Sequence, residues 1–285
     1  MKINIILILL FASSLFSCIN TINLDLPEKD KRLVVEGIVT DWDTVYTVRL
    51  SKTSKYSFRM NDASNEMENG AIVIISDNMS NSDTLNEVQS GIYQTSPFHI
   101  HGEVGRSYKL DIFTVLGKHY TSAPEVMVRS PKIDSIYFER DYNDKHSAYT
   151  YKNSIYIDWQ DPADTTNYYL HHFSYFWNKQ WHPENEWNRL FSDNMFNGQY
   201  LSKYIASTEY DGYGFYARIT RYSLSKRAFE FWNILNQQLY PPEDGVVNSS
   251  VPLIGNVYNV KDSNDFALGY FQVSGKNVTQ VYIDR

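Results

Sequence analysis

Hydrophobic residues recur at every second position in short runs from Leu33 onward, and this alternation limits the fold more than any other feature. The runs lie at 33–39, 45–50, 71–75, 92–95 and 108–113. Most of them alternate, whereas 71–75 is apolar throughout, which is typical of a central strand. Seven or so short strands with turn signals between them, and no helical period, predict a β-sandwich over residues 31–124.

A second β-rich domain is predicted after a short linker. Pro124 and Pro131 bracket a segment that we take as the linker, 125–131, and a new strand begins at Ile133. The second domain then covers 132–285. Its Trp159, followed by an Asp-Pro pair and a Tyr-Tyr pair, resembles the second and third strands of fibronectin-like sandwiches. The predicted fold class is therefore mainly β, with two β-sandwich domains.

One amphipathic helix is expected near the C-terminus, at 225–239. Six apolar residues fall at helical spacing: Leu224, Ala228, Phe231, Trp232, Leu235 and Leu239. Ser223 or Ser225 is suited to cap its start, and Pro241-Pro242 stops its end. We expect the apolar stripe to pack on the domain's own sheet, with a partner protein as the alternative.

The N-terminus carries a secretory signal of the lipoprotein kind. Lys2 gives a positive start, 3–16 is a short apolar run, and Cys18 follows a small residue. Cleavage before Cys18 would remove 1–17, and the thiol would carry diacylglycerol, a palmitate-type anchor. The apolar run is short for a spanning helix, so a retained membrane anchor is the weaker alternative, as is a plain cleaved signal. We predict a cell outer membrane location, lipid-anchored and surface-exposed.

The polar stretch 18–30 is predicted to be a tether between the lipid and the first strand. It contains Pro27 and shows no hydrophobic period. A tether of this length lets the folded part stand about 20 to 40 Å from the bilayer, depending on its extension. The expected partner at this end is the lipid of the outer membrane.

Charge and cysteine content exclude several functional classes. Without 1–17 the chain has 25 basic and 33 acidic residues, so nothing favours a nucleic-acid partner. Cys18 is the only cysteine, and acylation consumes it. Disulfides, a cysteine nucleophile and cysteine-ligated metals are therefore excluded within one chain.

No sequence pattern assigns an enzymatic reaction. The phosphate loop, H-E-x-x-H, G-x-S-x-G and EF-hand motifs do not occur. His99 and His101 share one face of an extended segment but lack a third ligand, and the adjacent His171 and His172 face opposite ways on a predicted strand. We therefore predict that the chain is not an enzyme and binds no metal or cofactor.

The most unusual stretch is 173–196, in which Trp177, Trp181 and Trp187 surround a proline. Their spacing is too irregular for one strand or one helix, so a loop is expected. Such a loop can present aromatic rings to a glycan or to the apolar surface of another protein. Alternatively, the tryptophans fold inward and cover the second sandwich.

Several short motifs together resemble a Bacteroidota lipoprotein family catalogued as a domain of unknown function (number 4249). They are Asn23-Leu24-Asp25-Leu26-Pro27, Leu33-Val34-Val35-Glu36-Gly37, Gly91-Ile92-Tyr93, Phe229-x-x-Trp232, Gly255-Asn256-Val257 and Leu268-Gly269-Tyr270-Phe271. The first half also resembles transthyretin-like, carboxypeptidase-regulatory sandwiches. Members of the family are commonly encoded beside TonB-dependent receptors, and the family brings no catalytic residues.

The resemblance implies a non-enzymatic accessory subunit of a TonB-dependent receptor. Such a subunit would dock on the barrel and help capture or gate its ligand, a glycan or a peptide. One alternative is a stand-alone surface adhesin or glycan-binding protein. Another is a structural accessory of an outer-membrane assembly machine.

Overall fold

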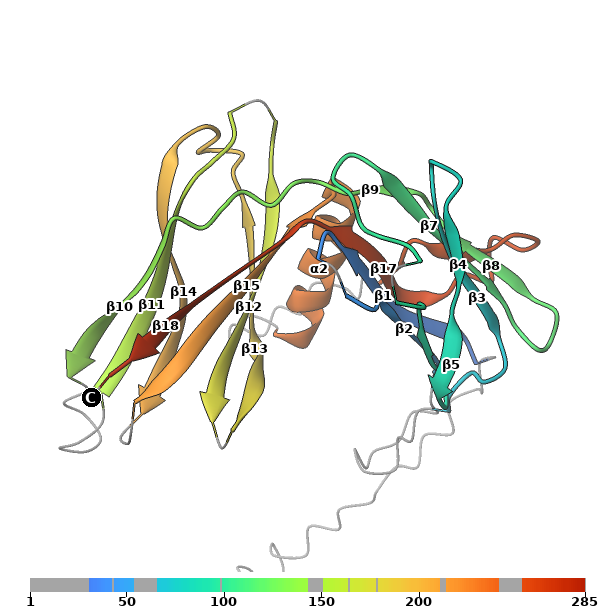
Figure 1. Ribbon diagram of the computed structural model, residues 1–285, viewed down its shortest axis with the longest axis horizontal. Helices are drawn as coiled ribbons and strands as arrows, with labels where there is room; N and C mark the ends of the chain where they lie inside the picture. The colour runs from blue at the N-terminus through green and yellow to red at the C-terminus, as the bar shows by residue number, and fades with distance from the viewer. Residues whose placement is uncertain are drawn as a thin grey trace, which may run out of the picture. The chain divides into compact units, whose positions relative to one another are not determined.

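The computed structural model describes residues 31–42, 44–53, 66–97, 99–142, 151–163, 165–177, 179–210, 214–240 and 253–284. The predicted signal peptide and tether, with Cys18, lie outside these residues. Within the described part the chain is mainly β, with strands β1 to β18 and one helix, α2 (Figure 1). The predicted fold class is confirmed at this level. The closer likenesses to transthyretin-like and fibronectin-like sandwiches stay predictions.

Two sheets are built mainly from the N-terminal part. Sheet A has the strand order β17-β1-β2-β6-β5, and sheet B has the order β16-β8-β7-β3-β4, with β9 paired to β7. The strands are β1 (Leu33–Thr40), β2 (Thr47–Lys52), β3 (Ile72–Asp77), β4 (Ser82–Thr84), β5 (Asn86–Gln89), β6 (Ile92–Gln94), β7 (Ser107–Phe113), β8 (His119–Ser122), β9 (Glu125–Val126), β16 (Val257–Asn259) and β17 (Leu268–Ser274). Alternate residues such as Val35, Val48, Val73 and Leu110 are fully buried and form one apolar core shared by both sheets.

The C-terminal part forms two further sheets. Sheet C has the order β10-β11-β14, and sheet D has the order β13-β12-β15-β18. The strands are β10 (Ser135–Tyr142), β11 (Tyr151–Gln160), β12 (Tyr168–Trp177), β13 (Gln180–Ser192), β14 (Tyr200–Tyr210), β15 (Phe215–Leu224) and β18 (Lys276–Ile283). Ile155, Ile157 and Trp159 alternate along β11 and share one of its faces. They are fully buried in a core that also contains Phe173 and Ile219 from sheet D.

The sheets do not follow the predicted domain boundary. Strands β16 and β17 belong to the stretch predicted as the second domain, yet β16 pairs with β8 and β17 runs parallel to β1. Periodicity shows that a strand exists but does not identify its partner. The sequence alone therefore assigns both strands to the second domain. The chain reaches sheet D directly after β17, at Gly275, whose N–H donates to Val128 O at 3.0 Å. This hydrogen bond holds the connection from β17 to β18 beside Val128, in the connection from β9 to β10.

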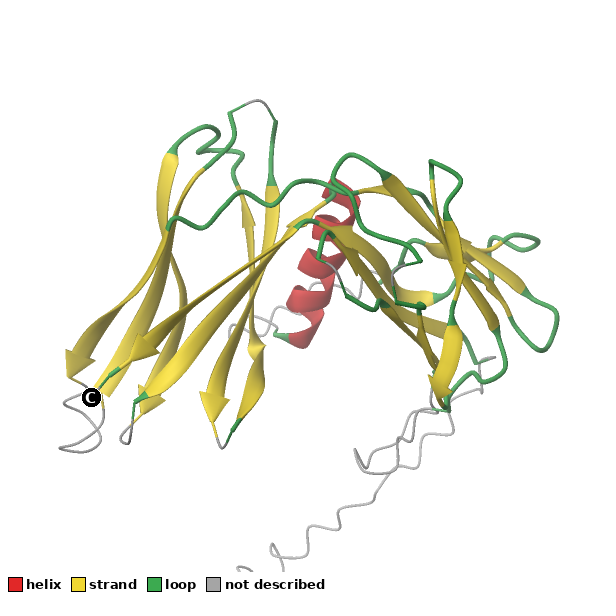
Figure 2. Cartoon of the chain, viewed as in Figure 1, coloured by secondary structure: helices red, strands yellow, loops and turns green. Residues whose placement is uncertain are grey.

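Helix α2 spans Lys226–Leu239, close to the predicted 225–239. Ser225 caps it, because its Oγ accepts the N–H of Ala228 at 3.1 Å. Ala228 and Phe231 are buried against sheet D and against Tyr270 of β17. Figure 2 shows this helix in red among the yellow strands. The expectation that the stripe packs on its own sheet is confirmed. The two prolines expected to stop the helix lie outside the described residues.

Candidate functional site

The tryptophan-rich stretch is a β-hairpin, so the expectation of a loop is wrong. Strands β12 and β13 pair from Trp177↔Gln180 back to Tyr168↔Ser192, with a register shift between His171 and Phe173. This bulge and the hairpin turn interrupt the two-residue period, which explains the irregular tryptophan spacing. A proline is tolerated within β13 because β13 is the edge strand of sheet D.

The structure places the three predicted tryptophans on these two strands. Trp177 ends β12 and Trp187 lies in β13, but their side chains are outside the described part of the molecule. The ring of Trp181 is half-buried on sheet D and contacts Phe176, with ring centroids 5.4 Å apart. Of the three tryptophans, Trp181 is therefore the one whose side chain the structure describes.

Trp181 belongs to a row of four aromatic residues that lie opposite one another across sheet D. Trp181 of β13 pairs with Phe176 of β12, which in turn pairs with Tyr216 of β15. Tyr216 pairs with Tyr282 of β18, with ring centroids 5.0 Å apart. We call these four residues the aromatic row. Tyr216 and Tyr282 are 45% and 51% exposed, so the β15–β18 end of the row is open to solvent.

Arg218 lies beside the aromatic row, opposite Ser174 and Gln280 in the next register position. Its guanidinium carbon is 3.5 Å from the centroid of Trp181, a cation–π contact, and Nη2 donates to Gln280 Oε1 at 3.4 Å. Its Nε has no hydrogen-bond partner in the described part of the chain. Burial lowers the Arg218 pKa from its ordinary value, yet an arginine remains cationic. The row thus combines exposed rings with a fixed positive charge.

The rest of this sheet face is covered by α2. Leu170 and Tyr222 pair beneath the helix, and the ring of His172 contacts both Tyr222 and Trp232. The aromatic row lies at the other end of the same strands, beyond Ser174 and Arg218. The face is therefore divided into a part buried by the helix and a part that is open.

A second aromatic row crosses the outer face of sheet C. Tyr137 pairs with Tyr156, and Tyr156 pairs with Tyr204. Tyr137 and Tyr156 stack at 5.4 Å, and Tyr137 Oη is 2.8 Å from Ser202 Oγ. These rings are half-buried, and the Arg189 guanidinium lies over the ring of Tyr204. We therefore regard the row on sheet D as the better candidate.

A buried polar cluster lies inside the core of sheets C and D. Arg221 Nε donates to His171 Nε2 at 3.0 Å, and the guanidinium lies over the rings of Trp159 and Tyr169. Burial lowers the pKa of Arg221 to about 10, and burial with the adjacent Arg221 charge holds the His171 pKa well below its ordinary value. A neutral His171 is therefore the acceptor for Arg221. Trp159, His171 and Arg221 are all at most 1% exposed.

Two buried carboxylates end the neighbouring strands. Asp161 accepts from Tyr169 Oη at 2.9 Å and from the Gly198 N–H at 3.2 Å. Asp193 accepts from the backbone N–H of Asn167 at 2.8 Å. Burial and the neighbouring Asp193 raise the pKa of Asp161. These carboxylates fix loops at one end of the sandwich, and both are buried from solvent.

His99 and His101 make separate contacts in the structure. His99 Nδ1 lies 3.4 Å from Asp83 Oδ1, whereas the backbone carbonyl of His101 accepts from Tyr108 Oη. No three His, Cys, Asp or Glu side chains are grouped to hold a metal ion within the described ranges.

A family model for a domain of unknown function, DUF4249, matches residues 19–280. The chain belongs to the DUF4249 family. No curated protein matches this DUF4249 chain. Its described helix is too short and too polar to cross a membrane.

Three of the sequence motifs that resemble DUF4249, 33–37, 255–257 and 268–271, meet around β17. Val35 of β1 pairs with Gly269, and Asn256 holds Phe271 through two hydrogen bonds. Asn256 Nδ2 donates to Phe271 O at 2.8 Å, and Phe271 N–H donates to Asn256 Oδ1 at 2.9 Å. A Cβ on Gly255 would lie 1.9 Å from Gly269 O. These motifs are therefore explained by packing.

Sequence reasoning missed most of the aromatic row. Phe176, Tyr216, Tyr282 and Arg218 lie on three strands that are far apart in the chain. The available signal is that Tyr216 and Tyr282 occupy the solvent-facing positions of alternating strands, where a polar residue is usual. The alternation shows that each residue faces solvent, but it does not show which strands pair to bring these residues into one surface.

Proposed function

We propose that this DUF4249 chain is a non-enzymatic outer-membrane lipoprotein that serves a TonB-dependent receptor and holds a ligand on the aromatic row. Lipidation at Cys18 would anchor it. The observation that carries the binding role is the open row of rings beside Arg218 on sheet D. The receptor partner is supported by the resemblance of the sequence to receptor-associated lipoproteins.

The chemistry of the aromatic row suits a glycan. Sugar rings present C–H groups that pack on aromatic faces, and Tyr216 and Tyr282 offer such faces to solvent. Arg218 offers planar N–H donors to hydroxyl or carboxylate groups. Because Arg218 covers one face of Trp181, ligand contacts would fall mainly on the two tyrosines and the guanidinium.

The absence of an enzymatic role is supported by how the buried polar groups are used. His171 accepts from Arg221, and Asp161 accepts from Tyr169 and from a backbone N–H. These groups are enclosed within the core and are engaged in holding strands and loops together.

Removing rings from the aromatic row should weaken glycan binding. We expect Tyr216→Ala and Tyr282→Ala each to weaken binding about two- to tenfold, because one aromatic contact contributes about 0.5–1.5 kcal/mol and a tenfold change is about 1.4 kcal/mol. The change is measured by screening neutral and uronic-acid oligosaccharides on an array and titrating the best ligand by calorimetry. Tyr200→Ala is the control, because Tyr200 is 59% exposed on sheet C. Equal binding by all variants would exclude the aromatic row as the glycan-binding site.

The receptor partner is tested by crosslinking in intact cells. We expect that purification in mild detergent on a C-terminal tag, followed by mass spectrometry, recovers a TonB-dependent barrel in near-equal amount. Recovery of the lipoprotein alone, with glycan binding intact, would favour the stand-alone adhesin. Recovery of an assembly machine without any glycan binding would favour the structural accessory.

A further inference from the structure

An apolar patch covers one end of sheet B and the tip of the β7–β8 hairpin. Its six members are exposed, with exposed fractions of 54% for Ile72, 39% for Phe113, 70% for Val115, 78% for Leu116, 43% for Tyr258 and 53% for Val260. They are continuous: Ile72 pairs with Phe113, Phe113 stacks on His119 at 4.2 Å, and Val260 N–H donates to His119 O at 2.9 Å. We call these six residues the end patch. Val115 and Leu116 form its convex tip.

The end patch lies where the chain enters the folded part. The guanidinium of Arg32, just before β1, donates to the carbonyl groups of Asn264 and Phe266. Asp265, between them, forms an ion pair of 2.8 Å with Lys118 at the base of the β7–β8 hairpin. Two contacts therefore link the start of β1 to the hairpin: Arg32 binds the segment 264–266, and Asp265 of that segment binds Lys118.

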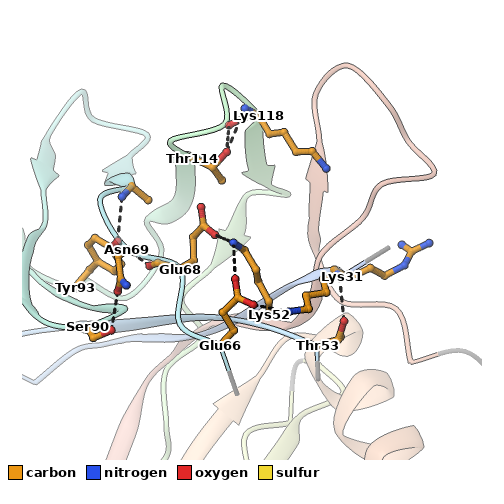
Figure 3. A network of polar contacts seen from close by, with 12 residues as sticks. Lys31, Lys52, Thr53, Glu66, Glu68, Asn69, Ser90, Tyr93, Thr114 and Lys118 are labelled. Carbon is orange, nitrogen blue, oxygen red and sulfur yellow. Dashed lines mark hydrogen bonds and ion pairs between the residues drawn. The ribbon is translucent and has the colours of Figure 1, made fainter. Parts of the chain in front are cut away.

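A network of charges fixes this end of the chain. Lys31 pairs with Glu66, and Lys52 lies 3.3 Å from Glu66 and 2.8 Å from Glu68. Figure 3 shows these residues as one connected group, with Lys118 of the hairpin in the same view. Lys31 thus has a defined place at the same end as the patch.

The length of the preceding chain limits how far this end can lie from the lipid. Only 12 residues separate Cys18 from Lys31. A flexible chain of that length has an end-to-end distance of roughly 20 Å. It reaches about 45 Å when fully extended. The lipid anchor would therefore keep the end patch at a high local concentration beside the bilayer.

We propose that the end patch rests on the lipid bilayer that holds the acylated Cys18, with Val115 and Leu116 inserted at its surface. This inference depends on the lipidation in the proposed function. A convex hairpin tip with two exposed aliphatic side chains suits the deformable interface of a membrane better than a preformed pocket. The ionic neighbours Lys118 and Asp265 are already paired with each other, and Asp111 is paired with Lys109 and His119. The contact would orient the protein as well as hold it.

The test places one fluorescent label at the tip of the acylated, full-length protein. Since Cys18 is the only native cysteine and carries the lipid, Leu116→Cys supplies the sole free thiol. The protein is reconstituted in vesicles of phosphatidylcholine and phosphatidylglycerol with brominated acyl chains. Met195→Cys is the control, because Met195 is 83% exposed in the C-terminal part. We expect at least threefold stronger quenching at position 116 than at position 195.

Equal quenching at the two positions would overturn the proposal. Emission at position 116 that shifts with protein concentration, without quenching by lipid, would assign the patch to a second copy or a protein partner and would also overturn it. Reaction of the label with the wild-type protein would instead show that Cys18 is free and that the proposed lipidation fails. In that case, Cys18→Ser combined with Leu116→Cys is added to preformed brominated vesicles, and loss of quenching there ends the membrane proposal.

Discussion

Replacing Gly269 with alanine should lower the free energy of unfolding by about 3 to 5 kcal/mol, a loss at the upper end for a single substitution. Gly269 has φ +80°, which non-glycine residues adopt at a cost of about 1 to 2 kcal/mol. A Cβ there would lie 2.1 Å from Val35 O, within the parallel pairing of β17 with β1. Relieving that contact requires the two strands to separate. Denaturant unfolding followed by circular dichroism measures the change.

A second glycine with positive φ separates the cost of the backbone conformation from the cost of the close contact between strands. Gly105 has φ +89°, and a Cβ there meets no atom within 4 Å. We expect Gly105→Ala to lose only the conformational part, about 1 kcal/mol. Similar losses in the two variants would show that the close approach of β17 to β1 contributes little.

The sequence predicted well whatever depends on local periodicity. The buried face of β11 could be read from the alternation of Ile155, Ile157 and Trp159, because a strand turns successive side chains to opposite faces. The helix could be read from its apolar spacing, and Ser225 is the cap because it precedes that pattern. Each of these features is set by residues within a few positions of one another.

Features that depend on strand pairing could not be predicted. Strand β17 can be recognised as a strand, but nothing local indicates that its parallel partner is β1, more than 200 residues earlier. The aromatic row could not be predicted for the same reason. Trp181, Tyr216 and Tyr282 are brought together only by the register of the paired strands. The bulge in β13 interrupts the alternation of its side chains, so the sequence predicted a loop there. Candidate surfaces on such sheets therefore require the pairing before they can be recognised.

Acid should destabilise the folded chain between pH 6.5 and pH 4 through two histidines. Burial beneath α2 lowers the pKa of His172 from 6.5 to about 4, and burial with the Arg221 charge lowers that of His171. In this range the unfolded chain binds protons that the folded chain does not, so the free energy of unfolding falls as the pH falls. For His172 alone the loss reaches about 3 kcal/mol near pH 4. The raised pKa of Asp161 acts in the opposite direction and offsets part of it.

Equilibrium unfolding at several pH values tests this dependence on His172. His172→Phe keeps a ring against Tyr222 and Trp232 but removes the proton site, so its stability should fall less steeply, by up to about 1.4 kcal/mol per pH unit. Tyr222→Phe is the control, because it alters a ring beside His172 whose raised pKa lies far above this pH range, and it should keep the wild-type slope. Because His172 Nε2 is buried without a partner in the described part of the structure, protonation would put an unpaired charge beneath α2. An unchanged slope in His172→Phe would mean that solvent reaches the imidazole, and that α2 covers sheet D less tightly than the packing of Trp232 indicates.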